Sequence, residues 1–233
     1  MSKRLLFLFL FSIITITGLS AQTGGLNLMG AFPQGEFKDN LDRVGYGLSG
    51  HFTFWTPDAS MPLTLGLNVG YINYGNDSRN TRISSDIPDV RVNVDRSYNI
   101  VNFHLLFQIS PLSGAVRPYL EALVGGSYLF TETKINSENY TNEVASSTNF
   151  DDWAWSYGPG GGMMIRLMER EPQGKEMELT SLWLDIKARY LLGSRAEYLK
   201  EGSVIINNGN VSYDVSRSTT DLLTIHLGVV AYF

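Results

Sequence analysis

The chain has 233 residues, a formal net charge of −5 and no cysteine. Its length fits one large domain or one barrel with long loops. The acidic balance argues against nucleic acid as a partner, and the lack of cysteine excludes disulfide bonds and a cysteine-linked lipid anchor. Glycine occurs 23 times and recurs inside apolar segments, which favours strands over helices.

The N-terminal segment has the pattern of a secretory signal. Lys3 and Arg4 form its charged start, and residues 5–14 form an apolar stretch that is too short for a transmembrane helix. Small residues follow, so we expect removal of residues 1–21 and a mature barrel of residues 22–233. Loss of the two cationic residues changes the formal charge from −5 to −7.

Alternation with a period of two residues predicts eight strands, each with one apolar face. The opposite face carries mostly Gly, Ser, Thr and Asn, which suit the crowded interior of a narrow barrel better than the water-facing side of a soluble sandwich. The pattern therefore favours a barrel. The predicted strands are 25–32, 45–56, 63–73, 101–109, 120–128, 156–167, 182–190 and 222–233. In the sixth strand, Pro159 removes a backbone donor, which indicates a bulge or an early strand start.

The connections between these strands alternate in length. Three are short (57–62, 111–116 and 169–179) and four are long (33–44, 74–95, 131–152 and 193–221). Short periplasmic turns and long external loops are typical of outer-membrane barrels, and this pattern places both termini in the periplasm.

The last strand ends the chain on an aromatic residue, with alternate apolar side chains on one face. It resembles the closing strand and assembly signal of bacterial outer-membrane barrels, with Tyr232 and Phe233 as the C-terminal signal. With the strand entry Tyr46-Gly47-Leu48, most of the mature chain resembles the small barrels of the OmpA/OmpX kind. The resemblance implies an all-β fold, an eight-stranded antiparallel up-and-down transmembrane β-barrel with long external loops. It also implies outer-membrane lipids, lipopolysaccharide and the barrel assembly machinery as partners.

Few charged residues fall on the predicted inner faces: Glu121, Arg166, Asp185, Lys187 and Arg189. Glu121, Arg166 and Asp185 reach similar heights when counted from the periplasmic turns, so we predict an ion-pair network across the interior. Buried charges are costly unless they are paired. Such a network could act as a gate or as a static plug. Eight strands leave room for little besides side chains, which favours the plug.

Three histidines, His51, His104 and His226, also project inward according to the alternation of faces along their predicted strands. Imidazoles at one level could hold a transition metal. No carboxylate shares their spacing, however, so we interpret them as hydrogen-bonded interior residues and expect neither a metal nor a cofactor.

Catalysis is disfavoured because no histidine is predicted to face lipid, where a lipid A-modifying enzyme would need its base. Residues 90–95 and the segments around an Asn207-Asn208-Gly209-Asn210 turn are expected to extend the barrel walls beyond the membrane. A tenth strand would arise if 203–215 crossed the membrane instead. The acidic stretch 131–152 could bind divalent cations that bridge to lipopolysaccharide.

The sequence thus predicts a non-enzymatic envelope protein, plugged by side chains, whose loops contact lipopolysaccharide or another surface, in a structural or adhesive role. The alternatives are a narrow channel, then a lipid A-modifying enzyme or an accessory of a secretion machine. A protein partner in the envelope or at the surface stays open.

Overall fold

The computed structural model describes residues 23–55, 62–82, 91–137, 143–170, 179–207 and 210–233. The expected signal segment lies outside these residues. The eight strands of the barrel are β1 (Thr23–Pro33), β2 (Gly45–Trp55), β3 (Leu63–Arg82), β4 (Arg91–Ile109), β5 (Val116–Ser137), β6 (Glu143–Glu169), β7 (Ser181–Gly193) and β12 (Leu222–Tyr232).

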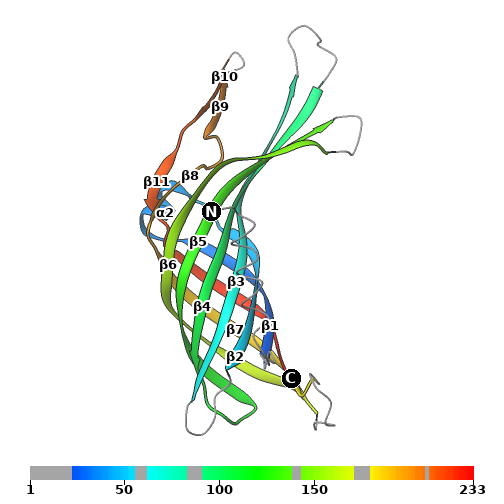
Figure 1. Cartoon of the computed structure of the whole chain (residues 1–233), viewed down its shortest axis with the longest axis vertical. Coiled ribbons are helices and arrows are strands. Elements are labelled where there is room, and N and C mark those ends of the chain that lie inside the picture. The colour runs from blue at the N-terminus through cyan, green and yellow to red at the C-terminus, as the bar shows by residue number, and fades with distance from the viewer. Residues whose placement is uncertain (1–22, 56–61, 83–90, 138–142, 171–178, 208–209) are drawn as a thin grey trace, which may run out of the picture.

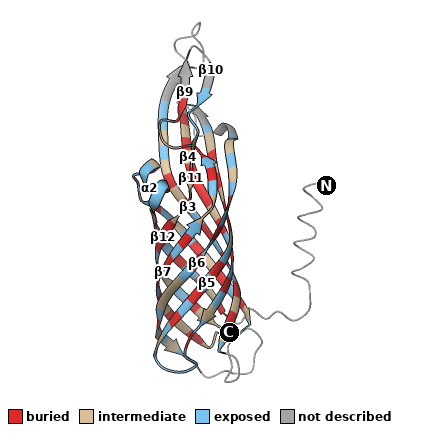
Figure 2. Cartoon of the chain, turned by 90° about the vertical axis from the view of Figure 1, so that its left-hand side faces the viewer, coloured by how far each residue is buried: buried red, intermediate tan, exposed pale blue. Residues whose placement is uncertain are grey.

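These strands form one closed antiparallel barrel in the order β1-β12-β7-β6-β5-β4-β3-β2. The first and last strands close it, with a continuous register from Thr23↔Tyr232 to Pro33↔Leu222. The predicted eight-stranded barrel is therefore confirmed. The strands run obliquely to the long axis of the barrel, so those of the near and far walls cross in the view of Figure 2. Closure satisfies the backbone hydrogen bonds that an open edge would leave in hydrocarbon.

The two faces of the wall differ sharply. Leu26 and Leu120 point outward and are each 72% exposed, whereas inward residues such as Asn27 and Ser127 are buried. A wall of apolar side chains facing outward all around would be unfavourable in water but is stable against lipid.

Four neighbouring strands, β3 to β6, continue past the barrel as a wall that we call the extension (Figure 1). The strand β3 pairs with β2 only as far as Asn73 and then runs nine residues further, to Arg82. At about 3.3 Å per residue this distance is about 30 Å along the strand. We call this end of the molecule the extension end, and the end where β1 starts and β12 finishes the terminal end.

The long connections predicted at 74–95 and 131–152 are therefore mostly strand. The prediction that the segment 90–95 lengthens the wall is confirmed for residues 91–95, which belong to β4, while residue 90 lies outside the described residues. The prediction for 203–215 is wrong in part: β9 (Val204–Asn207) and β10 (Asn210–Tyr213) pair with each other, as the turn signal indicated, but form a separate two-stranded sheet. The ten-stranded alternative is wrong for the same reason.

The extension end also carries a short helix, α2 (Gly35–Asn40), and a second small sheet of β8 (Arg195–Tyr198) and β11 (Ser216–Thr219). The helix packs against β11, and Figure 1 places both beside the rim of the barrel. We call α2 with residues 194–221, as far as the structure describes them, the cap.

Of the two alternatives expected from Pro159, the bulge is not found, whereas β6 does start earlier than predicted, at Glu143. Pro159 pairs with Ala122 of β5, and the register between β6 and β7 is the same on both sides of it, from Tyr157↔Leu192 to Gly160↔Arg189. The register shift between β6 and β7 lies at Arg166/Met168 instead. Within the described residues, no helix combines the length and apolar character required to cross a membrane.

Candidate functional site

A group of buried, charged side chains lies inside the barrel and is the main candidate for a functional site. We call it the lumen ion-pair cluster. It contains Glu121 of β5 and Asp185, Lys187 and Arg189 of β7, all buried. The Arg189 Nε donates to Glu121 Oε1 at 2.6 Å, and Arg189 Nη2 donates to Glu121 Oε2 at 3.1 Å, so the pair is bidentate. The Lys187 Nζ lies 2.8 Å from Asp185 Oδ2.

Neutral residues complete the cluster. The Tyr119 hydroxyl donates to Asp185 Oδ1 at 2.5 Å, and Arg189 Nη1 donates to Asn68 Oδ1 at 2.9 Å. Asn68 belongs to β3, which lies four positions from β7 around the eight-stranded ring and is therefore opposite it. One arginine side chain thus ties β7 to β5 and to the far wall, and it crosses the lumen.

Two glycines of β6 leave the space that these contacts occupy. Gly160 lies in register between Glu121 and Arg189, and a Cβ there would come within 2.8 Å of Glu121 Oε1 and 2.9 Å of Arg189 Cγ. Gly162 lies between Tyr119 and Lys187, where a Cβ would come within 2.7 Å of the Tyr119 hydroxyl oxygen. The sequence marked both glycines only as small inward residues.

The structure does not bring Arg166 into the cluster, contrary to the expectation. Its Nη1 lies 2.6 Å from Glu169 Oε2, and its Cζ lies 5.7 Å from the centre of the Trp183 ring. Arg166 is paired in register with Trp183, near the terminal end. Counting residues from the turns gave the wrong height, since the residue of β6 that lies beside Glu121 is Gly160.

The three histidines all point inward, and two of them, His104 and His226, bond to neutral partners. The His226 ring nitrogens lie 3.1 Å from Ser49 Oγ and 2.9 Å from Thr224 Oγ1, and His104 Nε2 lies 3.0 Å from Ser156 Oγ. Nδ1 of His51 has no hydrogen-bond partner among the described residues. No group of three potential metal ligands occurs in the part of the chain that the structure describes.

Apolar residues fill the lumen between this polar region and the extension end and continue into the cap. The centre of this packing is Phe37 of α2, which is fully buried and meets the Tyr198 ring edge-on at 5.1 Å between centroids. Burial raises the pKa of Tyr198, and its hydroxyl lies 2.8 Å from Ser218 Oγ. The Tyr74 hydroxyl donates to the carbonyl of Leu199 at 3.0 Å.

The C-terminal residues lie on opposite faces of the wall. The Tyr232 ring packs inside, 6.0 Å from that of Trp183 between centroids. Phe233 is 43% exposed, and its ring lies beside Gly24 of β1. The position of Phe233 is compatible with an accessible assembly signal.

The closed barrel, its outward apolar wall and its polar, ion-paired interior define a small transmembrane β-barrel of the bacterial outer-membrane class. Solved structures similar to the chain in fold include Neisserial surface protein A, with 11% identity and a TM-score of 0.41 over 91% of this chain and 96% of that one. A major outer membrane protein from Thermus thermophilus has 15% identity and a TM-score of 0.42 over 91% and 99%. The N-terminal β-barrel domain of Pseudomonas aeruginosa OprF has 12% identity and a TM-score of 0.32 over 91% and 98%. No family model and no curated protein matches the sequence.

Proposed function

We propose that this chain is a non-enzymatic barrel of the bacterial outer membrane, sealed to ions, whose extension contacts lipopolysaccharide or another surface outside the cell. In this arrangement both termini are periplasmic. The main observation in support of a sealed lumen is that the Arg189 side chain crosses it. The guanidinium bonds both to Glu121 and to Asn68 on the opposite strand.

A small interior cavity supports the same conclusion. A cavity of about 20 Å³ lies beside His51, Thr64 and Gln108. This volume accommodates about one water molecule and no hydrated ion. Beyond it the ion-pair cluster and then the apolar filling of the cap occupy the lumen.

The extension supports contact at a surface because its polar wall projects beyond the barrel and is not required to close the barrel. On the outward face of its base, Asn73, Asn76, Ser97 and Asn99 form a hydrogen-bonded group. The orientation follows from the general asymmetry of this class, in which periplasmic turns are short and external segments long.

Conductance of the purified protein in planar lipid bilayers tests the seal. We expect no steady ion current. A persistent, voltage-independent current through wild-type protein would favour the narrow channel instead.

Labelling of single cysteines tests the orientation, because the chain has none of its own. Ser78→Cys lies on the extension and Ser113→Cys at the turn between β4 and β5. Both sites are exposed. In intact cells a membrane-impermeant maleimide should label Ser78→Cys and should reach Ser113→Cys only after the outer membrane is permeabilised. The reverse result would overturn the proposed orientation.

A further inference from the structure

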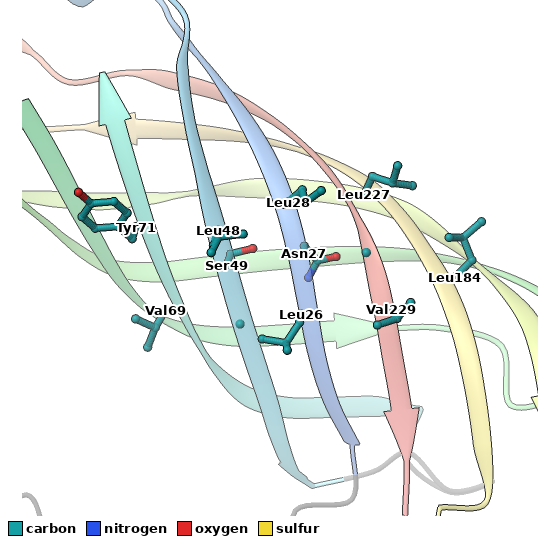
Figure 3. A pocket seen from close by; sticks show the side chains of 12 residues that line it. Leu26, Asn27, Leu28, Leu48, Ser49, Val69, Tyr71, Leu184, Leu227 and Val229 are labelled. Atoms are coloured by element: carbon teal, nitrogen blue, oxygen red, sulfur yellow. The ribbon is translucent and has the colours of Figure 1, made fainter. Parts of the chain in front are cut away.

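The outward wall carries a groove that the seal does not use. It has a volume of about 580 Å³ and crosses strands β7, β12, β1, β2 and β3 (Figure 3). Its lining is almost entirely apolar; the outward side chains that form it are Leu26, Leu28, Leu48, Val69, Tyr71, Leu184, Leu227 and Val229.

The groove exists because one outward position on β2 has no side chain. Gly50 lies in register between Leu26 of β1 and Val69 of β3. A Cβ at Gly50 would meet Leu26 Cδ2 at 3.4 Å, so a larger side chain could stand there and fill the hollow without displacing backbone.

One margin of the groove leads into a polar group. The Tyr71 hydroxyl donates to Asn99 Oδ1 at 2.7 Å, and Asn73 Nδ2 donates to the same oxygen at 3.0 Å. Asn73 and Asn76 exchange hydrogen bonds of 3.2 and 2.9 Å through their side-chain amides. We call Asn73, Asn76, Ser97 and Asn99 the amide cluster.

The position of the amide cluster limits what can approach it. It lies on the outward side of the wall, further toward the extension end than Tyr71, and it continues the surface that faces lipid. A ligand bound there would therefore lie against the outer surface of the barrel wall. The hydrogen bonds within the amide cluster hold its side chains in place. Neutral amides and hydroxyls of this kind suit hydrogen bonding to sugar hydroxyl groups.

We propose that the groove and the amide cluster form one binding site for lipopolysaccharide. An acyl chain lies in the groove over Gly50, and the sugar portion contacts Asn73 and Asn76. This inference rests on the proposed function, since it needs the extension end to lie on the outer-leaflet side of the membrane.

The test measures binding of purified rough lipopolysaccharide to the folded protein in detergent by native mass spectrometry. Gly50→Leu should weaken binding about tenfold, which corresponds to loss of one well-packed apolar contact. The matched control is Ala122→Leu, an outward substitution on β5 that lies outside the groove lining and should leave binding unchanged. Equal binding by Gly50→Leu and wild type would overturn the groove as the acyl-chain site.

Two further measurements test the proposed contact between the sugar portion of lipopolysaccharide and the amide cluster. The double variant Asn73→Ala/Asn76→Ala should also lose about tenfold in affinity, while Ser147→Ala, an exposed residue of β6, should not. Phospholipid, which has acyl chains and no sugar, should compete poorly. If phospholipid competes as well as lipopolysaccharide, the site is a general lipid groove and the proposal is wrong.

The outcomes separate this inference from the proposed function. Binding in detergent requires neither the seal nor a given orientation. Absence of lipopolysaccharide binding with normal labelling and no conductance would remove this inference alone. Labelling of Ser113→Cys in intact cells would instead overturn the proposed orientation, and with it the site in the outer leaflet, whatever the binding measured in detergent.

Discussion

Arg189 on β7 bonds to Asn68 on β3, at 2.9 Å, across the full width of the barrel. The same guanidinium holds Glu121 in a bidentate pair. A single side chain therefore fixes the distance between two opposite walls and neutralises a buried carboxylate.

Replacing Arg189 with Met should lower the free energy of unfolding by about 3–5 kcal/mol, because it leaves Glu121 buried without its counter-charge. Urea titration of the folded protein in detergent measures this loss. Glu169→Gln is the matched control, since it removes the exposed partner of Arg166 and should cost about 1 kcal/mol or less. Similar losses for the two variants would contradict the role assigned to the buried pair.

Gly160→Ala should weaken the same pair without altering either charge. The added methyl group would come within 3 Å of both Glu121 and Arg189, and such crowding typically costs about 1–3 kcal/mol. The comparison is Gly24→Ala, whose Cβ would lie at 3.8 Å from the Phe233 ring and should change stability by about 0.5 kcal/mol or less. Urea midpoints that fall equally in both variants would indicate a general sensitivity of glycine in strands.

Phe37→Ala should loosen the cap and leave the barrel closed. Its ring is fully buried against Tyr198 and Tyr74, and loss of a buried phenylalanine typically costs about 3–5 kcal/mol locally. Hydrogen exchange should accelerate in β8 and β11 but not in β7 or β12. Leu112→Ala, at an exposed position of the terminal-end turn, should change neither. Faster exchange throughout the barrel strands would show that the cap and the barrel unfold together.

Phe233→Ala should reduce the amount of assembled barrel in cells with little effect on its stability once folded. Phe233 is 43% exposed, so its packing contribution is small, and the expected loss reflects recognition by the assembly machinery. Phe52→Ala provides the control, because Phe52 is outward-facing and 44% exposed. The ratio of folded to unfolded protein on unboiled gels measures assembly. Equal reductions in the two variants would argue against a specific C-terminal signal.

Strand alternation was sufficient to predict the barrel because lipid imposes a strict rule on alternate residues. Segments such as Leu63–Asn73 and the last strand therefore stand out. The extension was predicted only in part, at 90–95, because most of its residues beyond the barrel form no alternating apolar face. Residues 76–82 read Asn-Asp-Ser-Arg-Asn-Thr-Arg and show no period.

The alternation of faces along each strand identified Glu121, Asp185, Lys187 and Arg189 as inward-facing, and these four residues lie together. It could not give the height of Arg166, because strand tilt and register decide which residues of neighbouring strands are level. The helix α2 was also missed, since six residues inside a long connection give too short a pattern to recognise. The groove at Gly50 is lined by residues of five strands, and no single segment reveals it.

The lumen ion-pair cluster and the aromatic packing around Phe37 obstruct the same passage at two successive levels. On the proposed function, both barriers must be removed before solutes can pass. A variant that lacks one of them should therefore stay tight, and leakage should emerge only when both are removed together. Such redundancy would protect the envelope against single lesions in this protein.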